Sequence, residues 1–232
     1  MSETLQIDDL TVAVRRSSRR KHVDLTVQRD GGITVAVPAA MELPTVERLV
    51  RRRLVTLYSA LERKRETLSA QPAKEYVTGE GFYYLGRKYR LKLIDDAPKA
   101  GLRLHEGRFL LPRDRVEQGR AQFIRWYTDH ARPWLADRVA ALQDRVAVKP
   151  TGVRVRDLGY RWASCGKGGM LYFHWRVILL PPARIEYLVL HELCHLHHHD
   201  HSPAFYERLR RASPNYRKHD AWLREHGDGY RL

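Results

Sequence analysis

The chain has 232 residues, enough for one large domain or two modest ones with a hydrophobic core. Hydrophobic residues make up 43% and charged residues 30%, a globular balance that excludes an intrinsically disordered chain. Lys and Arg number 42 against 27 Asp and Glu, a formal net charge of +15, so contact with nucleic acid through a basic surface is one expectation, although an arginine-rich surface alone gives the same charge.

The N-terminal part, residues 1–112, is predicted to be an α/β portion with β-hairpins and a long helix. Apolar and polar residues alternate over residues 23–37 on both sides of the turn Asp30-Gly31-Gly32, which is typical of paired strands. From Pro44 to Leu61 the apolar residues recur at helical spacing. A second hairpin is expected over residues 84–93.

The C-terminal part, residues 113–232, is predicted to begin with helical structure over residues 114–146, kinked or split at Pro133. A half-buried strand is expected over residues 171–177, and a helix from about Ala183. Two Ser-Pro pairs, each a cap followed by proline at the first helical position, predict two short closing helices: Ser202-Pro203 and Ser213-Pro214.

The segment from His191 to His195 has the pattern HExxH. On a helix, residues four apart lie on one face, so the imidazoles of His191 and His195 can converge on one ion. Zinc accepts neutral imidazole nitrogen, and in catalytic sites it keeps one position open for water. The ion lowers the pKa of that water toward about 7. Glu192, directly after the first ligand, is placed to take the proton as general base.

The spacing alone leaves the third ligand open. If the helix continues past His195, His198 lies on the same face. If it ends near His198, the chain can fold back and present His201, which gives HExxH-x5-H. A carboxylate from a later helix, Glu207 or Glu225, is the alternative that ranks second. We prefer His201.

Several segments of the C-terminal part occur in a fixed order, and a tail with the pattern PNY and a Trp-Leu pair follows them. They are Arg161-Trp162-Ala163-Ser164-Cys165, Phe173-His174-Trp175-Arg176, Tyr187 to His195 and His201-Ser202-Pro203-Ala204-Phe205. In order and spacing they resemble the YgjP-like metal-dependent hydrolases, a zincin-like group near the SprT and WLM metalloproteases. The resemblance is close over residues 150–226.

The resemblance implies a zinc ion held by His191, His195 and His201, with Glu192 catalytic. It also implies an α+β fold in which an N-terminal α/β portion precedes a minimal zincin-like catalytic domain that carries the HExxH helix. The chain departs from the family pattern at four positions, none of them a proposed ligand or base: Ala163 for Gly, His174 for Asn, Cys194 for Ala and Tyr206 for Trp.

Two further residues are candidates for contacts beside the metal. Arg176 is predicted to meet a carboxylate or phosphate of the substrate. Tyr216 is predicted to donate to a developing oxyanion.

Three functions are consistent with these residues. A metallopeptidase, in which zinc-bound water is activated by Glu192, ranks first, because HExxH in this context is most often peptidase chemistry. A nucleoside triphosphate pyrophosphatase or phosphohydrolase ranks second, since the family has been linked to that activity and the basic charge suits an anionic substrate. A nucleic-acid-associated protein with a structural zinc ranks third. Closed structural zinc sites have four protein ligands and usually cysteines, whereas the site expected here has three histidines and an open position.

The sequence predicts a cytoplasmic protein. The first ten residues have no basic segment followed by an apolar one, so no signal peptide is expected. Apolar runs are too short for a membrane span, and no membrane partner is expected. Cys165 and Cys194 do not make a disulfide framework, which favours a reducing compartment.

Overall fold

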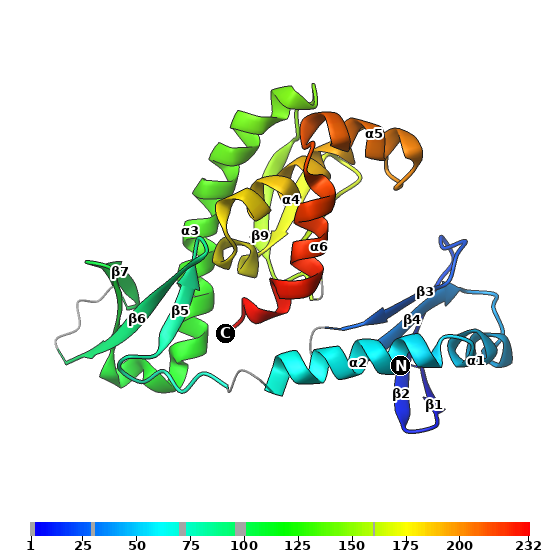
Figure 1. Ribbon diagram of the computed structural model, residues 1–232, viewed down its shortest axis with the longest axis horizontal. Coiled ribbons are helices and arrows are strands. Elements are labelled where there is room, and N and C mark those ends of the chain that lie inside the picture. Colours follow the sequence, from blue (N-terminus) through cyan, green and yellow to red (C-terminus); the bar gives the residue numbers. More distant parts are fainter. Residues whose placement is uncertain (1–2, 29–30, 70–72, 96–100, 160) are drawn as a thin grey trace. The chain divides into compact units, whose positions relative to one another are not determined.

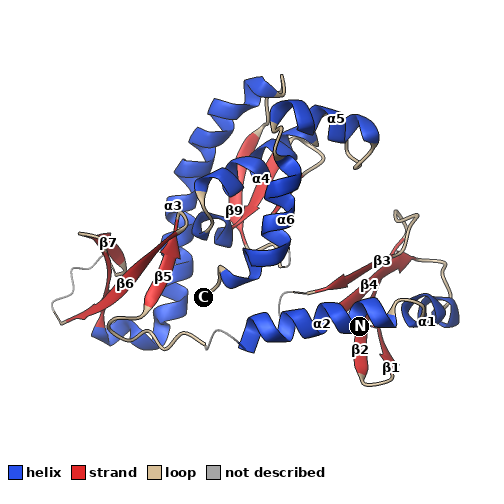
Figure 2. Ribbon diagram, in the orientation of Figure 1, coloured by secondary structure: helices blue, strands red, loops and turns tan. Residues whose placement is uncertain are grey.

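The computed structural model describes residues 3–28, 31–69, 73–95, 101–159 and 161–232 (Figure 1). The chain divides into two compact units, Met1–Pro72 and Ala73–Leu232. Helices and strands occur in both, which confirms the predicted α+β class (Figure 2).

The first unit is a four-stranded sheet with two helices. Its strands are β1 (Glu3–Ile7), β2 (Leu10–Ser17), β3 (Asp24–Val27) and β4 (Ile33–Pro38). Their order is β1-β2-β4-β3, and only the β2–β4 pair is parallel. The expected β3–β4 pairing is confirmed, while Asp30 of the predicted turn lies outside the described residues.

The segment predicted to be a helix from Pro44 onward is helical, but it is not one continuous helix. The structure has two helices, α1 (Leu43–Arg51) and α2 (Leu54–Ser69), separated by Arg52 and Arg53. Val46 and Val50 of α1 share a hydrophobic core with Leu57 and Leu61 of α2 and with the sheet. The break between the helices lets both bury their apolar faces, while the exposed arginines at the break stay in water.

The second unit opens with a sheet of order β5-β6-β8-β7. Its strands are β5 (Gly81–Tyr84), β6 (Arg87–Ile94), β7 (Arg103–His105) and β8 (Arg108–Pro112), followed by the 3₁₀-helix η1 (Arg113–Gln118) and helix α3 (Gly119–Leu142). The predicted hairpin at 84–93 is confirmed as the β5–β6 pair. Phe82 of β5 and Phe109 of β8 pack on Phe123 of α3, at ring-centroid distances of 4.0 and 5.0 Å from it. The domain boundary predicted between residues 112 and 113 therefore falls inside one hydrophobic core. Helix α3 runs unbroken through Pro133, so it is not split there.

A smaller sheet of order β10-β11-β9 follows the 3₁₀-helix η2 (Gln143–Arg145). Its strands are β9 (Gly152–Arg156), β10 (Ala163–Cys165) and β11 (Met170–His174). The strand predicted over 171–177 ends at His174, because Trp175–Leu179 forms the 3₁₀-helix η3 instead. All five residues of η3 are buried, whereas a strand buried on one face would turn every second side chain outward.

The chain closes with helices α4 (Pro182–Cys194), α5 (Pro203–Ala212) and α6 (Tyr216–His226) and the 3₁₀-helix η4 (Gly227–Gly229). Helix α4 contacts both α5 and α6 (Figure 1). Ser202 caps α5 as predicted, since its hydroxyl accepts from the backbone N–H of Phe205. Helix α6 begins two residues later than the Ser213-Pro214 pair predicts, with Asn215 at the cap position. Among the described residues, no helix is long and apolar enough to cross a membrane.

Candidate metal centre

Three histidine rings meet at the end of helix α4. The Nε2 atoms of His195 and His201 lie 3.2 and 3.1 Å from Nε2 of His191. In each of the three residues one ring nitrogen lies within 4.8 Å of those of the other two. Ligands about 2.0–2.1 Å from a tetrahedral ion such as zinc are themselves about 3.3 Å apart, close to the two Nε2 separations. The three rings therefore fit a single metal ion.

The turn after α4 explains how His201 reaches the other two histidines. The helix ends at Cys194, and the backbone N–H groups of His197 and His198 both donate to the Cys194 carbonyl. The chain then reverses into α5, behind the cap at Ser202. Of the open alternatives for the third ligand, the structure places His201 beside the other two rings.

The other candidates for the third ligand are not part of this cluster. The backbone carbonyl of His198 accepts a hydrogen bond from Nδ1 of His195, at 2.9 Å. Glu207 pairs with Arg210 and Arg211 at 2.9 and 3.0 Å. Glu225 lies 3.7 Å from His226.

The protonation of the histidines also suits a metal. Because Nδ1 of His195 donates to a carbonyl, its Nε2 carries the lone pair in the neutral ring. Burial, together with the neighbouring rings of His195 and His201, lowers the pKa of His191 to about 3. Burial likewise lowers the pKa of His195. Neutral imidazoles are the form that binds metal ions, so His191 and His195 are available to a cation near neutral pH.

The ring of Phe205 packs against all three imidazoles, a contact that the HExxH pattern does not reveal. Its centroid lies 5.0, 4.5 and 4.9 Å from those of His191, His195 and His201. Nδ1 of His191 is buried with no hydrogen-bond partner among the described residues, so packing against Phe205 and Tyr187 orients that ring. The available signal was the position of Phe205, four residues after His201 and in the first turn of α5.

Glu192 is buried beside the histidines, with 5% of its surface exposed. Burial raises the pKa of its carboxyl group to about 8, although two neighbours oppose the shift. The backbone N–H of Cys165 donates to the carboxylate, and the charge of Arg161 favours the ionised form. Strand β10 therefore positions the glutamate, a contact that the HExxH spacing does not reveal.

A cavity of about 420 Å³ opens over these groups. Helix α4 and the turn after it form one side, and the segment Arg161 to Cys165 forms the other. Its lining consists of Arg161, Ala163, Ser164, Cys165, His191, Glu192, His195, His199 and His201. The segment Arg161 to Cys165, which is part of the family resemblance, therefore forms one wall of the candidate site.

Arg176 and Tyr216, the two predicted substrate contacts, are not among the residues that line this cavity. Arg176 is buried, and burial lowers the pKa of its guanidinium to about 10. Its Nε donates to the carbonyl of Tyr230 at 2.9 Å. Tyr216 stacks on Tyr206, and its hydroxyl accepts from Arg217. Substrate contact by either residue stays a prediction.

Converging histidines beside a buried glutamate on one helix are typical of metal-dependent hydrolases. The family model of the YgjP-like metallopeptidase domain matches residues 21–226, so the chain belongs to the YgjP-like family. Searches of the curated proteins and of the solved structures found no significant match. Membership of this family makes the protein a metal-dependent hydrolase, and the histidine triad is where its described residues can hold a divalent ion.

Proposed function

We propose that the protein is a zinc-dependent metallopeptidase in which His191, His195 and His201 hold the ion and Glu192 is the general base. The observation that carries the proposal is the convergence of three imidazole nitrogens within 4.8 Å of one another, next to a buried carboxylate in a cavity. Three neutral nitrogen ligands with room for a further one are the donor set of a catalytic zinc site.

A bound zinc ion would polarise the scissile carbonyl and make the attacking water more acidic. The residues of the chain supply the remaining steps. Glu192 takes the proton of the water on its carboxylate and passes it to the nitrogen of the leaving amine. Among the described residues that line the cavity, Arg161 is the one Lys or Arg, and its charge would stabilise a developing oxyanion.

Strand β10 favours a peptide as the substrate. It lies at the edge of its sheet, and its three residues line the cavity. An extended peptide can add to such an edge by backbone hydrogen bonds, which would present the scissile bond to Glu192.

The test compares Glu192→Gln with Glu186→Gln on the zinc-loaded protein. Both changes remove a carboxylate from α4, but Glu186 is a half-buried partner of Arg138 outside the cavity. We expect Glu192→Gln to keep about one zinc per chain and to lose peptide cleavage by about 10²–10⁴-fold. The control should cleave as the wild type does. Cleavage within tenfold of wild type in a zinc-loaded Glu192→Gln protein would exclude the proposed base.

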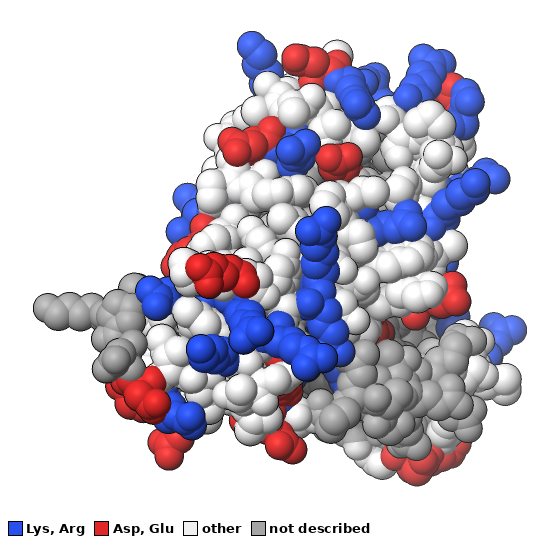
Figure 3. Space-filling model, turned by 60° about the vertical axis from the view of Figure 1, so that its left-hand side comes forward, with Lys and Arg blue, Asp and Glu red and all other residues white. Residues whose placement is uncertain are grey.

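A nucleoside triphosphate is the second candidate substrate, and Arg161 at the cavity wall is the observation that favours it. The formal net charge of +15 is in keeping with an anionic ligand, and on the face in Figure 3 Lys and Arg cover more surface than Asp and Glu. A panel of nucleotides tests this candidate. It is abandoned if none gives metal-dependent release of phosphate or pyrophosphate.

A cytoplasmic location and contact with nucleic acid through the basic surface stay predictions. The second would require DNA binding that weakens steeply as the salt concentration rises.

A further inference from the structure

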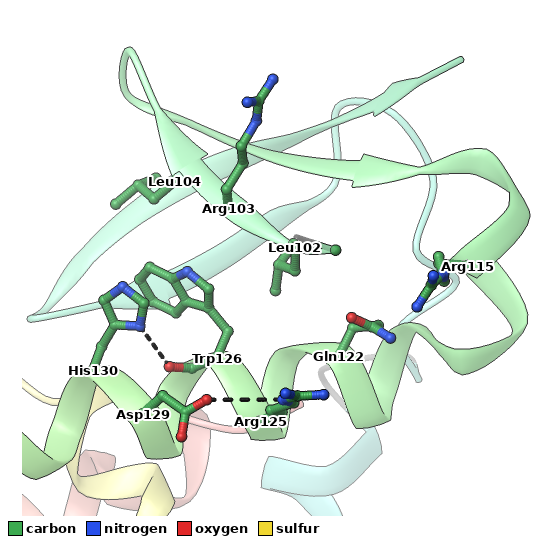
Figure 4. A pocket seen from close by; sticks show the side chains of 10 residues that line it. Leu102, Arg103, Leu104, Arg115, Gln122, Arg125, Trp126, Asp129 and His130 are labelled. Carbon is green, nitrogen blue, oxygen red and sulfur yellow. Dashed lines mark hydrogen bonds and ion pairs between the residues drawn. The ribbon is translucent and has the colours of Figure 1, made fainter. Parts of the chain in front are cut away.

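A second cavity, of about 440 Å³, lies in the second unit and shares no residue with the metal cavity. It lies between helix α3 and strand β7 with the residues before it (Figure 4). Three arginines and one aspartate line it, so positive charge is in excess. A volume of this size is in the range of small-molecule sites.

One end of this cavity is suited to an anion. Gln122 and Arg125 come from successive turns of α3, and Arg115 comes from η1 (Figure 4). The Arg125 guanidinium lies 3.9 Å from Asp129, and that of Arg115 lies 3.8 Å from Asp114. Each guanidinium has five N–H donors, and within the described part of the chain one contact of this length leaves most of them available. A planar guanidinium pairs well with phosphate or carboxylate oxygens.

The other end is apolar and planar. The ring of His130 stacks on Trp126, with centroids 3.7 Å apart and planes inclined by 21°. Nδ1 of His130 donates to the Trp126 carbonyl at 2.8 Å, so Nε2 of the neutral ring is an acceptor. Leu104 of β7 lies over these rings (Figure 4). Gln122 and His130 are about 12 Å apart along α3, at about 1.5 Å per residue.

We propose that this cavity binds a small molecule in which a phosphate or carboxylate is joined to a planar ring. The anionic group pairs with Arg115 and Arg125, and the ring lies against the Trp126–His130 stack under Leu104. The site is separate from the metal cavity, so it stands whatever the metal centre hydrolyses.

Calorimetric titration of the full-length protein tests the proposal with three probes: adenosine monophosphate, ribose 5-phosphate and benzoate. We expect adenosine monophosphate or benzoate to bind with a Kd below about 1 mM. The first result identifies a phosphate as the anion, and the second a carboxylate. Ribose 5-phosphate, which lacks the planar ring, should bind at least tenfold more weakly than adenosine monophosphate if the anion is a phosphate.

Variants locate the bound probe. Arg125→Gln should weaken its binding at least tenfold, while Arg120→Gln, an exposed position of the same helix outside the cavity, should change it less than twofold. His130→Ala should weaken binding of the ring-bearing probe about tenfold and leave that of ribose 5-phosphate unchanged. Arg115→Gln repeats the first test if Arg125→Gln does not fold, as judged by its melting curve.

Three results would overturn the proposal. The first is the absence of binding by all probes below about 1 mM. The second is an equal loss in Arg120→Gln and Arg125→Gln, which would indicate non-specific attraction to a basic surface. The third is loss of binding in His191→Ala with full binding in Arg125→Gln, which would place the probe at the metal cavity.

Discussion

The metal cavity and the second cavity are nearly equal in volume, about 420 and about 440 Å³, but they hold their charged groups in different ways. At the metal cavity, Glu192 and His191 are desolvated. Burial raises the pKa of Glu192 and lowers that of His191, and each shift favours the neutral form of the side chain. At the second cavity, Arg125 and Asp129 keep 84% and 51% of their side-chain surface in water. Volume therefore says little about chemistry, because the desolvation of the lining groups decides what they can do.

The largest effect should come from the ligands of the metal cavity. His201→Ala should lose the metal, whereas His198→Ala should keep it, because His195 uses the backbone carbonyl of His198 and not its ring. The two histidines lie in the same segment between α4 and α5, so the pair of variants is closely matched. Metal content per chain, measured by mass spectrometry after dialysis, distinguishes them. Equal loss from both variants would contradict the triad.

A smaller effect should follow from the packing around the ligands. Phe205→Leu keeps an apolar side chain but removes the flat ring that contacts all three imidazoles. We expect metal affinity to fall by about tenfold, the lower end of what outer-sphere changes cost. Competition with a chelator of known affinity measures the change. Unchanged affinity would show that the helix backbone alone fixes the rings.

The candidate site was predictable from sequence where its geometry is local. Two histidines four apart on one helix must share a face, so His191 and His195 followed from spacing alone. His201 followed in part, since the turn after α4 depends on where the helix ends. The hydrogen bond from Cys165 to Glu192 did not follow, because it joins segments 27 positions apart that meet only through tertiary packing.

In the fold, too, local features were predictable from the sequence and tertiary contacts were not. The β5–β6 hairpin was predictable, because Gly86 marks its turn: its φ is +77°, and a Cβ there would lie 2.8 Å from Cα of Pro181. The 3₁₀-helix Trp175–Leu179 was not predictable, because an apolar segment buried on all sides has no periodicity that distinguishes a strand from a short helix. The unit boundary was missed for a related reason. Apolar residues of β6, β8 and α3 show that each element is buried, but not that they bury one another.

A buried arginine, Arg176, and an exposed one, Arg125, show how desolvation changes the effect of a side chain on stability, and replacing the buried one should have the larger effect. Arg176 is 8% exposed, its Nε donates to the Tyr230 carbonyl and its guanidinium lies 5.3 Å from the centre of the Trp162 ring. Arg176→Gln leaves that carbonyl without its charged donor, which should reduce the free energy of unfolding by about 1–3 kcal/mol. Urea denaturation measures this loss, and metal content should stay at the wild-type level. Loss of hydrolysis at unchanged stability would instead support the predicted substrate contact.

The smallest effect on stability should come from Arg125 at the second cavity. Its contact with Asp129 is long and exposed, and pairs of this kind contribute about 0–1 kcal/mol. Arg125→Gln should therefore unfold at nearly the same urea concentration as the wild type, even though we expect it to bind the anionic probe at least tenfold more weakly. A loss of stability as large as that of Arg176→Gln would show that Arg125 is a structural residue like Arg176. A change in binding without a change in stability is the result that distinguishes a ligand site from a solvated surface.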